Sequence, residues 1–144
     1  MTRHERASTE PFKTETVWNA GLAGTGVARE GLSLTVGHEG DWVPEHLLLL
    51  AAESCFMSTL LTLAVDAGID VLGYVSKGSL DVPRDPGQAS LLLSPCAVVA
   101  TTGDAERLTA LGRQAQRDSI VARMLGDRFR VELDVRTLPS EAAE

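Results

Sequence analysis

The sequence predicts an α+β fold, and three of its segments carry that prediction. The segment from Pro44 to about Ala67 is almost entirely apolar and is long enough for a helix of several turns. Residues 104–125 repeat apolar side chains at helical spacing, whereas residues 129–136 alternate between apolar and charged side chains. Helical and strand segments therefore occupy separate blocks of the chain, as in other α+β proteins.

The size of the chain predicts one domain. A chain of 144 residues, 44% hydrophobic and 23% charged, is suited to bury a single core. We expect that domain to span residues 1–144, with frayed termini at 1–11 and 139–144.

Charge and cysteine content restrict the partners and the compartment. The net charge of -7 argues against binding of nucleic acid, because that needs clustered basic side chains and the arginines here are scattered among acids. The amino terminus has mixed charge and lacks the apolar core of a secretory signal, and two cysteines do not make a disulfide scaffold. We therefore expect a cytoplasmic protein with reduced thiols.

Residues 12–36 are expected to form short strands separated by glycine turns. Phe12 to Asn19 alternates in polarity, and Leu32, Leu34 and Val36 are expected to place one face inward. The stretch from Gly21 to Gly26 lacks the lysine and the strand-to-helix context of a phosphate-binding loop, so it is interpreted as a turn.

The apolar segment is expected to form a helix that begins at Pro44-Glu45 and stops at Gly68. Its apolar residues cover nearly the whole circumference, so it must be enclosed, and a domain this small favours enclosure by a second copy in a homodimer. Leu47 to Val65 approaches the length of a membrane span, but Glu53 lies inside it and no basic residue flanks it. We expect a core helix and no membrane contact.

The remaining elements are a hairpin, a second helix and a final strand. The hairpin comprises residues 71–82 and 89–102, and Pro95 within it predicts a bulge or an edge position. The second helix runs from Asp104 as N-cap to Leu125. Its inward stripe consists of Leu108, Leu111, Ala115, Ser119 and Ala122. The strand over residues 129–136 turns its apolar residues inward and its charged residues outward.

Cys55 is the first candidate for chemistry, because a thiolate is a nucleophile. Two features oppose this role: Cys55 lies three turns into its helix, and the nearest charge in the chain is Glu53. A packing role is the alternative.

The pattern around Cys55 favours chemistry. The segment Trp42-Val-Pro-Glu-His-Leu-Leu-Leu-Leu-Ala-Ala-Glu-Ser-Cys-Phe resembles the central helix of the OsmC/Ohr family, which opens with Pro-Glu and carries a Ser-Cys-Phe step ten residues later. The order of elements over about residues 12–136 is also similar. The resemblance implies antiparallel sheets wrapped around central helices in an intertwined homodimer, with the active site at the subunit interface. Glu45 and Cys55 lie about 15 Å apart along a straight helix, so an interface would also let these two groups meet.

The resemblance implies a peroxidase in which Cys55 attacks a hydroperoxide and Glu45 holds an arginine beside the thiolate. The resemblance also implies a second cysteine, in the second helix, that forms a disulfide with the oxidised one. Two parts of that machinery differ here, since Ser119 stands at the position of this second cysteine and Leu22 at that of the arginine. Arg29 is the candidate replacement cation, and the alternative is a solvated turn residue.

Cys96 is a candidate redox partner of Cys55, although its apolar neighbours Leu92 and Val98 favour a buried structural thiol. His38 and His46 lack partner ligands at metal spacing, so neither a metal nor a cofactor is expected. Trp42 is interpreted as a lid over an interface or pocket.

Two functions follow from these observations. The first is a thiol-dependent peroxidase that acts on organic hydroperoxides, with Cys55 as nucleophile and an external thiol as reductant. The second is a non-catalytic relative that binds a small hydrophobic molecule at the dimer interface, which the less polar Leu22 and Ser119 favour.

Overall fold

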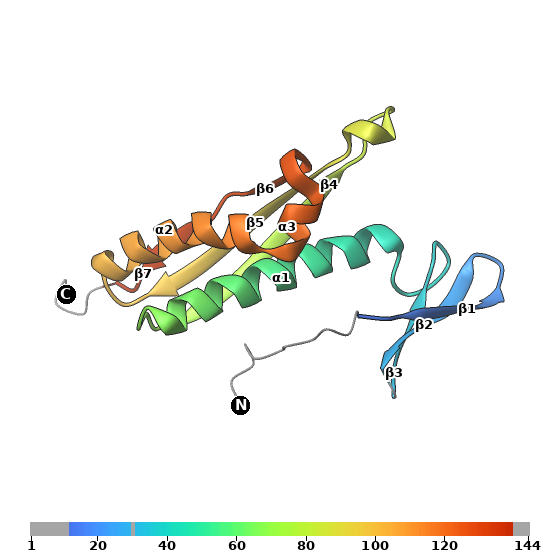
Figure 1. Ribbon diagram of the computed structural model, residues 1–144, viewed down its shortest axis with the longest axis horizontal. Coiled ribbons are helices and arrows are strands. Elements are labelled where there is room, and N and C mark those ends of the chain that lie inside the picture. Colours follow the sequence, from blue (N-terminus) through green and yellow to red (C-terminus); the bar gives the residue numbers. More distant parts are fainter. Residues whose placement is uncertain (1–11, 30, 140–144) are drawn as a thin grey trace. The chain divides into compact units, whose positions relative to one another are not determined.

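A computed structural model describes residues 12–29 and 31–139 of the protein (Figure 1). Within these residues it contains three α-helices and two β-sheets, so the α+β class is confirmed. The expected frayed segment 1–11 and residues 140–144 of the other lie outside the described residues. The chain divides into two compact units, Met1–His46 and Leu47–Glu144, and each is described by itself.

The first unit is an antiparallel sheet in the order β1-β2-β3, formed by β1 (Glu15–Ala20), β2 (Ala23–Arg29) and β3 (Leu32–Val36). The short strands are confirmed, but the predicted turn over residues 21–26 is shorter than expected. Gly21, with a φ of 55°, and Leu22 form the turn between β1 and β2, whereas Gly24 and Gly26 lie within β2. The prediction that β3 faces inward is wrong for this unit, because Leu32 and Leu34 are 57% and 45% exposed. A single sheet layer cannot bury either of its own faces.

Helix α1 (Pro44–Asp66) begins and ends close to the predicted residues. Pro44 fits the first turn because its missing N–H would have no partner there, and the Glu45 carboxylate meets the positive end of the helix dipole. Gly68 adopts a φ of 71°, and its N–H donates to the carbonyl of Val65 at 3.1 Å. The glycine therefore ends the helix with a left-handed residue, as expected.

The second unit contains a mixed sheet built on a hairpin. Strands β4 (Gly73–Asp81) and β5 (Ser90–Val99) pair antiparallel, with the short 3₁₀ turn η1 (Pro86–Gln88) between them, so the predicted hairpin is confirmed. Strands β6 (Phe129–Val131) and β7 (Asp134–Thr137) pair with β5 in parallel. The expectation of antiparallel sheets is therefore met only in part in this unit: β4 and β5 are antiparallel, whereas β6 and β7 run parallel to β5 because the helices between β5 and β6 return the chain in the same direction.

Pro95 explains why the final strand is divided in two. The proline lies in the central strand β5, without a bulge in its pairing to β4, so the predicted bulge or edge position is wrong. The carbonyls of Leu93 and Val99 point toward β6 and β7, which places the imide nitrogen of Pro95 on the same side. Because proline has no N–H to donate, pairing stops there, and the predicted strand over residues 129–136 becomes β6 and β7.

The second helical segment also consists of two pieces. Helix α2 (Thr102–Asp118) is capped by the Thr101 hydroxyl, which accepts from the N–H of Asp104 at 3.1 Å. The predicted N-cap at Asp104 is therefore wrong by three residues. Ser119 interrupts the helix, and α3 (Ile120–Leu125) follows, succeeded by the 3₁₀ turn η2 (Gly126–Arg128).

Helices α1 and α2 pack on one face of the β4–β5 sheet (Figure 1). The core consists of Ala52, Phe56, Leu60, Ala64, Ile69, Leu91, Leu93, Ala97, Val99, Leu108, Ala115, Ala122 and Phe129. Only one side of α1 contributes to it. The helix has the length and hydropathy of a membrane span, and 22% of its most apolar window is buried, so the expected full enclosure does not arise within this unit.

Candidate thiol site between α1 and α2

Cys55 on α1 lies against Ser119, the residue that separates α2 from α3. The Ser119 hydroxyl donates to the Cys55 sulfur at 3.0 Å, although 64 residues separate the two in the chain. Ser119 is 1% exposed, whereas Cys55 is partly exposed. The structure thus places Ser119, which stands at the position of the family's second cysteine, beside Cys55.

The backbone of Ser119 is fixed on both sides. Its N–H donates to the carbonyl of Ala115 at 2.9 Å, and its carbonyl accepts from the N–H of Arg123 at 3.0 Å. The inward stripe on this segment is confirmed, with Leu108, Ala115, Ser119 and Ala122 buried and Leu111 partly buried.

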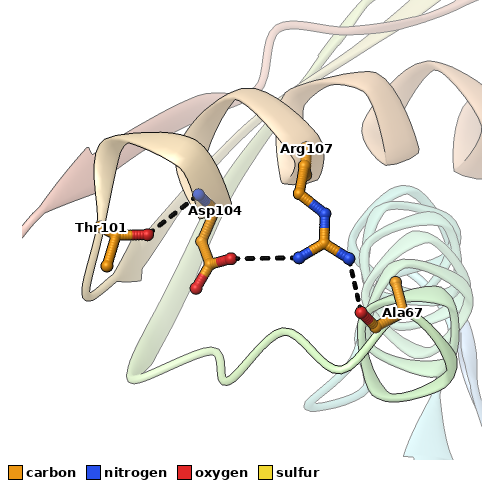
Figure 2. A network of polar contacts seen from close by, with 4 residues as sticks. All are labelled: Ala67, Thr101, Asp104 and Arg107. Atoms are coloured by element: carbon orange, nitrogen blue, oxygen red, sulfur yellow. Dashed lines mark hydrogen bonds and ion pairs between the residues drawn. The ribbon is translucent and has the colours of Figure 1, made fainter.

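Figure 2 shows a second contact between the two helical segments, at Ala67, directly after the carboxyl end of α1. The Arg107 guanidinium donates to the carbonyl of Ala67 at 2.6 Å and to the Asp104 carboxylate at 3.3 Å. Because the last turn of α1 has no basic residue, Arg107 supplies the positive charge that favours a helix carboxyl end. The two contacts show that α1 and α2 are antiparallel.

Glu53 lies on the opposite side of α1 from Cys55 and faces β4. Ser76 donates to its carboxylate at 3.5 Å. A Cβ at Gly78 would lie 2.9 Å from the same carboxylate, so glycine leaves the space that Glu53 occupies. The charge of Glu53 was expected to oppose a thiolate at Cys55. That objection is weakened, because the carboxylate points at the sheet and away from Cys55.

Tyr74, a residue of β4, lies near Glu53 of α1. The sequence did not mark it as a site residue. Its hydroxyl oxygen is buried and has no hydrogen-bond partner among the residues that the structure describes. Burial, reinforced by the negative charge of Glu53, raises the pKa of Tyr74 to about 12. Tyr74 therefore keeps its phenol proton to a higher pH than an exposed tyrosine does.

Cys96 does not belong to this site. The odd-numbered residues of β5 face the helices and are buried, whereas Cys96 is partly exposed on the other face. Its neighbours there include Asp134 and Arg136. A bridge between Cys55 and Cys96 in one chain is incompatible with this arrangement, and the expectation of a buried thiol is wrong because this sheet face is uncovered in the unit.

The other predicted site residues lie in the first unit. Arg29 ends β2 and is exposed, Glu45 is exposed in the first turn of α1, and the N–H of Leu22 donates to the Glu39 carboxylate at 2.9 Å. Trp42 is 38% exposed and pairs with Val36. Since Cys55 belongs to the second unit, the proposed roles of Arg29 and Glu45 beside Cys55 stay predictions.

Metal binding finds no support in residues 12–29 and 31–139. No group of three or more histidine, cysteine or acidic side chains in these residues is arranged to hold an ion. His38 lies exposed in the loop after β3, and His46 is exposed on α1.

The family model of OsmC-like proteins matches residues 37–134, which include Cys55, Ser119 and the helices α1, α2 and α3. The chain belongs to the OsmC-like family. Membership agrees with α1 as the core helix of this fold, although its length would also suit a membrane. No functionally curated protein matches this OsmC-like chain in sequence.

Solved structures show the same fold. An OsmC-like protein of unknown function from Vibrio cholerae has a TM-score of 0.74 at 16% identity, over 86% of this chain and 99% of that chain. An organic hydroperoxide resistance protein from Legionella pneumophila has a TM-score of 0.66 at 19% identity, over 90% and 98%. The organic hydroperoxide resistance protein OhrB of Bacillus subtilis has a TM-score of 0.64 at 17% identity, over 89% and 99%.

Proposed function

We propose that this OsmC-like protein is a thiol-dependent peroxidase in which Cys55 reduces organic hydroperoxides. The observation that carries the proposal is the position of Cys55, partly exposed on α1 with its sulfur 3.0 Å from a buried hydroxyl. A packing cysteine needs no polar partner, whereas a reactive thiolate needs access and a hydrogen-bond donor. Some proteins of the same fold are named as organic hydroperoxide resistance proteins.

The proposed reaction has two stages. The Cys55 thiolate attacks one peroxide oxygen, the S–O bond forms as the O–O bond breaks, and the leaving alkoxide takes a proton from water to become an alcohol. Sulfur is thereby oxidised to the sulfenic acid. An external thiol then attacks the sulfenic sulfur and displaces water, which forms a mixed disulfide. A second thiol molecule attacks the mixed disulfide, so that the Cys55 thiol is regenerated and the two reductant molecules leave as their disulfide.

We further propose that the working form is a homodimer. One face of α1 is formed by Leu47, Leu50, Ala51, Ser54, Ser58, Leu61, Thr62 and Val65, which are exposed or partly exposed and include no charge. We call it the uncharged face. Small residues at its centre let a second helix approach closely, and a second copy would cover it, as the family's intertwined dimer would require. Arg29 and Glu45 are proposed to complete the site at that interface.

Labelling of the sulfenic acid tests the peroxidase. The protein is treated with cumene hydroperoxide, trapped with a dimedone-type reagent and digested, and the adduct is located by mass spectrometry. We expect rapid, saturable labelling at Cys55, lost in Cys55→Ser and retained in the matched Cys96→Ser variant. A Cys55 that stays reduced while Cys96 or methionines oxidise would contradict the proposal.

A non-catalytic binding protein is the second candidate. Leu22, 60% exposed at the position of the family's arginine, favours it, because leucine cannot stabilise a thiolate. This function predicts that an apolar fluorescent probe binds with equal affinity to wild type and Cys55→Ser, with no consumption of hydroperoxide by either. Peroxide turnover that depends on Cys55 decides against it.

A further inference from the structure

Ser119 occupies the N-cap position of α3. It is the residue before the first turn of α3, where a serine hydroxyl usually accepts a hydrogen bond from the backbone of the next turn. Ser119 makes no such cap hydrogen bond, and its hydroxyl instead donates to Cys55. The start of α3 thus lacks its usual side-chain cap, and the donor is directed at the sulfur.

Within the described residues, the Ser119 hydroxyl is the side-chain donor to Cys55. Apart from Ser119, no side chain among the residues that the structure describes has a recorded hydrogen bond or ion pair with the Cys55 sulfur. A hydroxyl that is 1% exposed does not exchange its partner for bulk water at low cost. Since both backbone groups of Ser119 are hydrogen-bonded, the donor is held in place before the sulfur becomes charged.

We infer that Ser119 is a positioning residue for Cys55, whose hydroxyl donates to the thiolate and holds the sulfur in its reactive state. This inference rests on the proposed function for its purpose, but the thiol reactivity that it predicts exists without any peroxide. A hydrogen bond to the charged form of an acid favours that form. The same hydroxyl cannot form a disulfide, so the oxidised sulfur stays open to an external thiol.

The test measures how fast Cys55 is alkylated by iodoacetamide as a function of pH, in a Cys96→Ser background that leaves one thiol. We expect Ser119→Ala to move the midpoint of this profile upward and to lower the rate at neutral pH by about tenfold. Thiolate absorbance in the ultraviolet should shift by the same amount. An unchanged profile in a folded Ser119→Ala protein would overturn the inference.

Ser119→Cys keeps the size of the side chain and provides a second measurement that does not depend on tolerance of alanine. Because the two side-chain atoms lie 3.0 Å apart, little movement is needed for an S–S bond of about 2.05 Å. One equivalent of hydroperoxide should give a disulfide between Cys55 and the new thiol, found by mass spectrometry. Absence of that disulfide under a mild thiol oxidant would contradict the geometry on which the inference depends.

The two claims fail separately. If Ser119→Ala shifts the pH profile of Cys55 alkylation but the protein consumes no peroxide, the peroxidase proposal is refuted and the role of Ser119 is supported. Peroxide consumption with an unshifted profile would support the peroxidase and overturn the role of Ser119.

Discussion

Tyr74 is the residue whose ionisation the fold alters most clearly. Burial and the charge of Glu53 raise its pKa from 10.0 to about 12, so the folded state holds the phenol proton more tightly than the unfolded state. The tyrosine contributes full stability below pH 10, where both states are protonated. That contribution is lost as the pH rises from about 10 to about 12, because the unfolded state alone loses its proton there.

The prediction for Tyr74 can be read directly, since it is the single tyrosine of the chain. The tyrosinate absorbance should titrate near pH 12 in the folded protein and near 10 in urea. The free energy of unfolding should fall between these pH values in the wild type, and this fall should be smaller by about 1 kcal/mol in Tyr74→Phe. The figure is reduced because the side chain is partly exposed. Identical titrations in the folded and unfolded states would contradict the environment described for Tyr74.

The hydrogen bond from Arg107 to the Ala67 carbonyl contributes a free energy that two matched variants can measure. Arg107→Ala removes the hydrogen bond to the Ala67 carbonyl at 2.6 Å and the exposed pair with Asp104. We expect a loss of about 1 kcal/mol in the free energy of unfolding by urea, mostly from the carbonyl contact. Arg113→Ala is the control, because Arg113 is also exposed on α2 and has no recorded partner in the described part of the chain. Equal losses in the two variants would show that the contact adds nothing.

At the scale of elements, Gly112 in α2 sits where a larger residue would meet the break between β6 and β7. A Cβ there would lie within 2.5 Å of the Leu133 side chain. Gly112→Ala should therefore gain no net stability, although alanine in a helix is favoured by about 1 kcal/mol.

A double-mutant cycle isolates this contact. In a Leu133→Ala background the space is free, and Gly112→Ala should then stabilise by about 1 kcal/mol. The measurement is urea unfolding of the four proteins at one pH. The same stabilisation in both backgrounds would show that Leu133 does not restrict position 112.

The elements that the sequence predicted well are those whose signal is local. Helix α1 is marked by Pro44 at its start and Gly68 after its end, and the last segment by strict alternation. The break at Pro95 was missed because it depends on which strand pairs with β5, and the N-cap was missed because Thr101 and Asp104 are both capping residues.

The candidate site was predictable in part for the same reason. The motif around Cys55 and the position of Ser119 in the apolar stripe were visible in the sequence, whereas the hydrogen bond between them depends on how two distant helices meet. The contact between Glu53 and Ser76 was not predictable. Helical periodicity separates buried from exposed positions, but it does not tell which element a partly buried residue such as Glu53 faces.

At the scale of the whole molecule, the proposed dimer explains why an apolar helix is buried on one side only. Residues on the uncharged face of α1 such as Leu50 and Val65 are 43% and 72% exposed in this chain. Exposed apolar surface of this kind costs free energy in water, and a second copy would remove it. A lysine at the centre of the face would bring two charges into the interface without partners.

Ser58→Lys should therefore dissociate the dimer, whereas Ala110→Lys on the exposed side of α2 should leave it intact. Sedimentation velocity over a range of concentrations would give the mass of each protein. We expect a dimer for wild type and Ala110→Lys, and a Kd for Ser58→Lys raised by about 100-fold or more, since an unpaired buried charge costs at least about 3 kcal/mol. A monomeric wild type would refute the dimer, and with it the proposal that Arg29 and Glu45 complete the site of Cys55 across an interface.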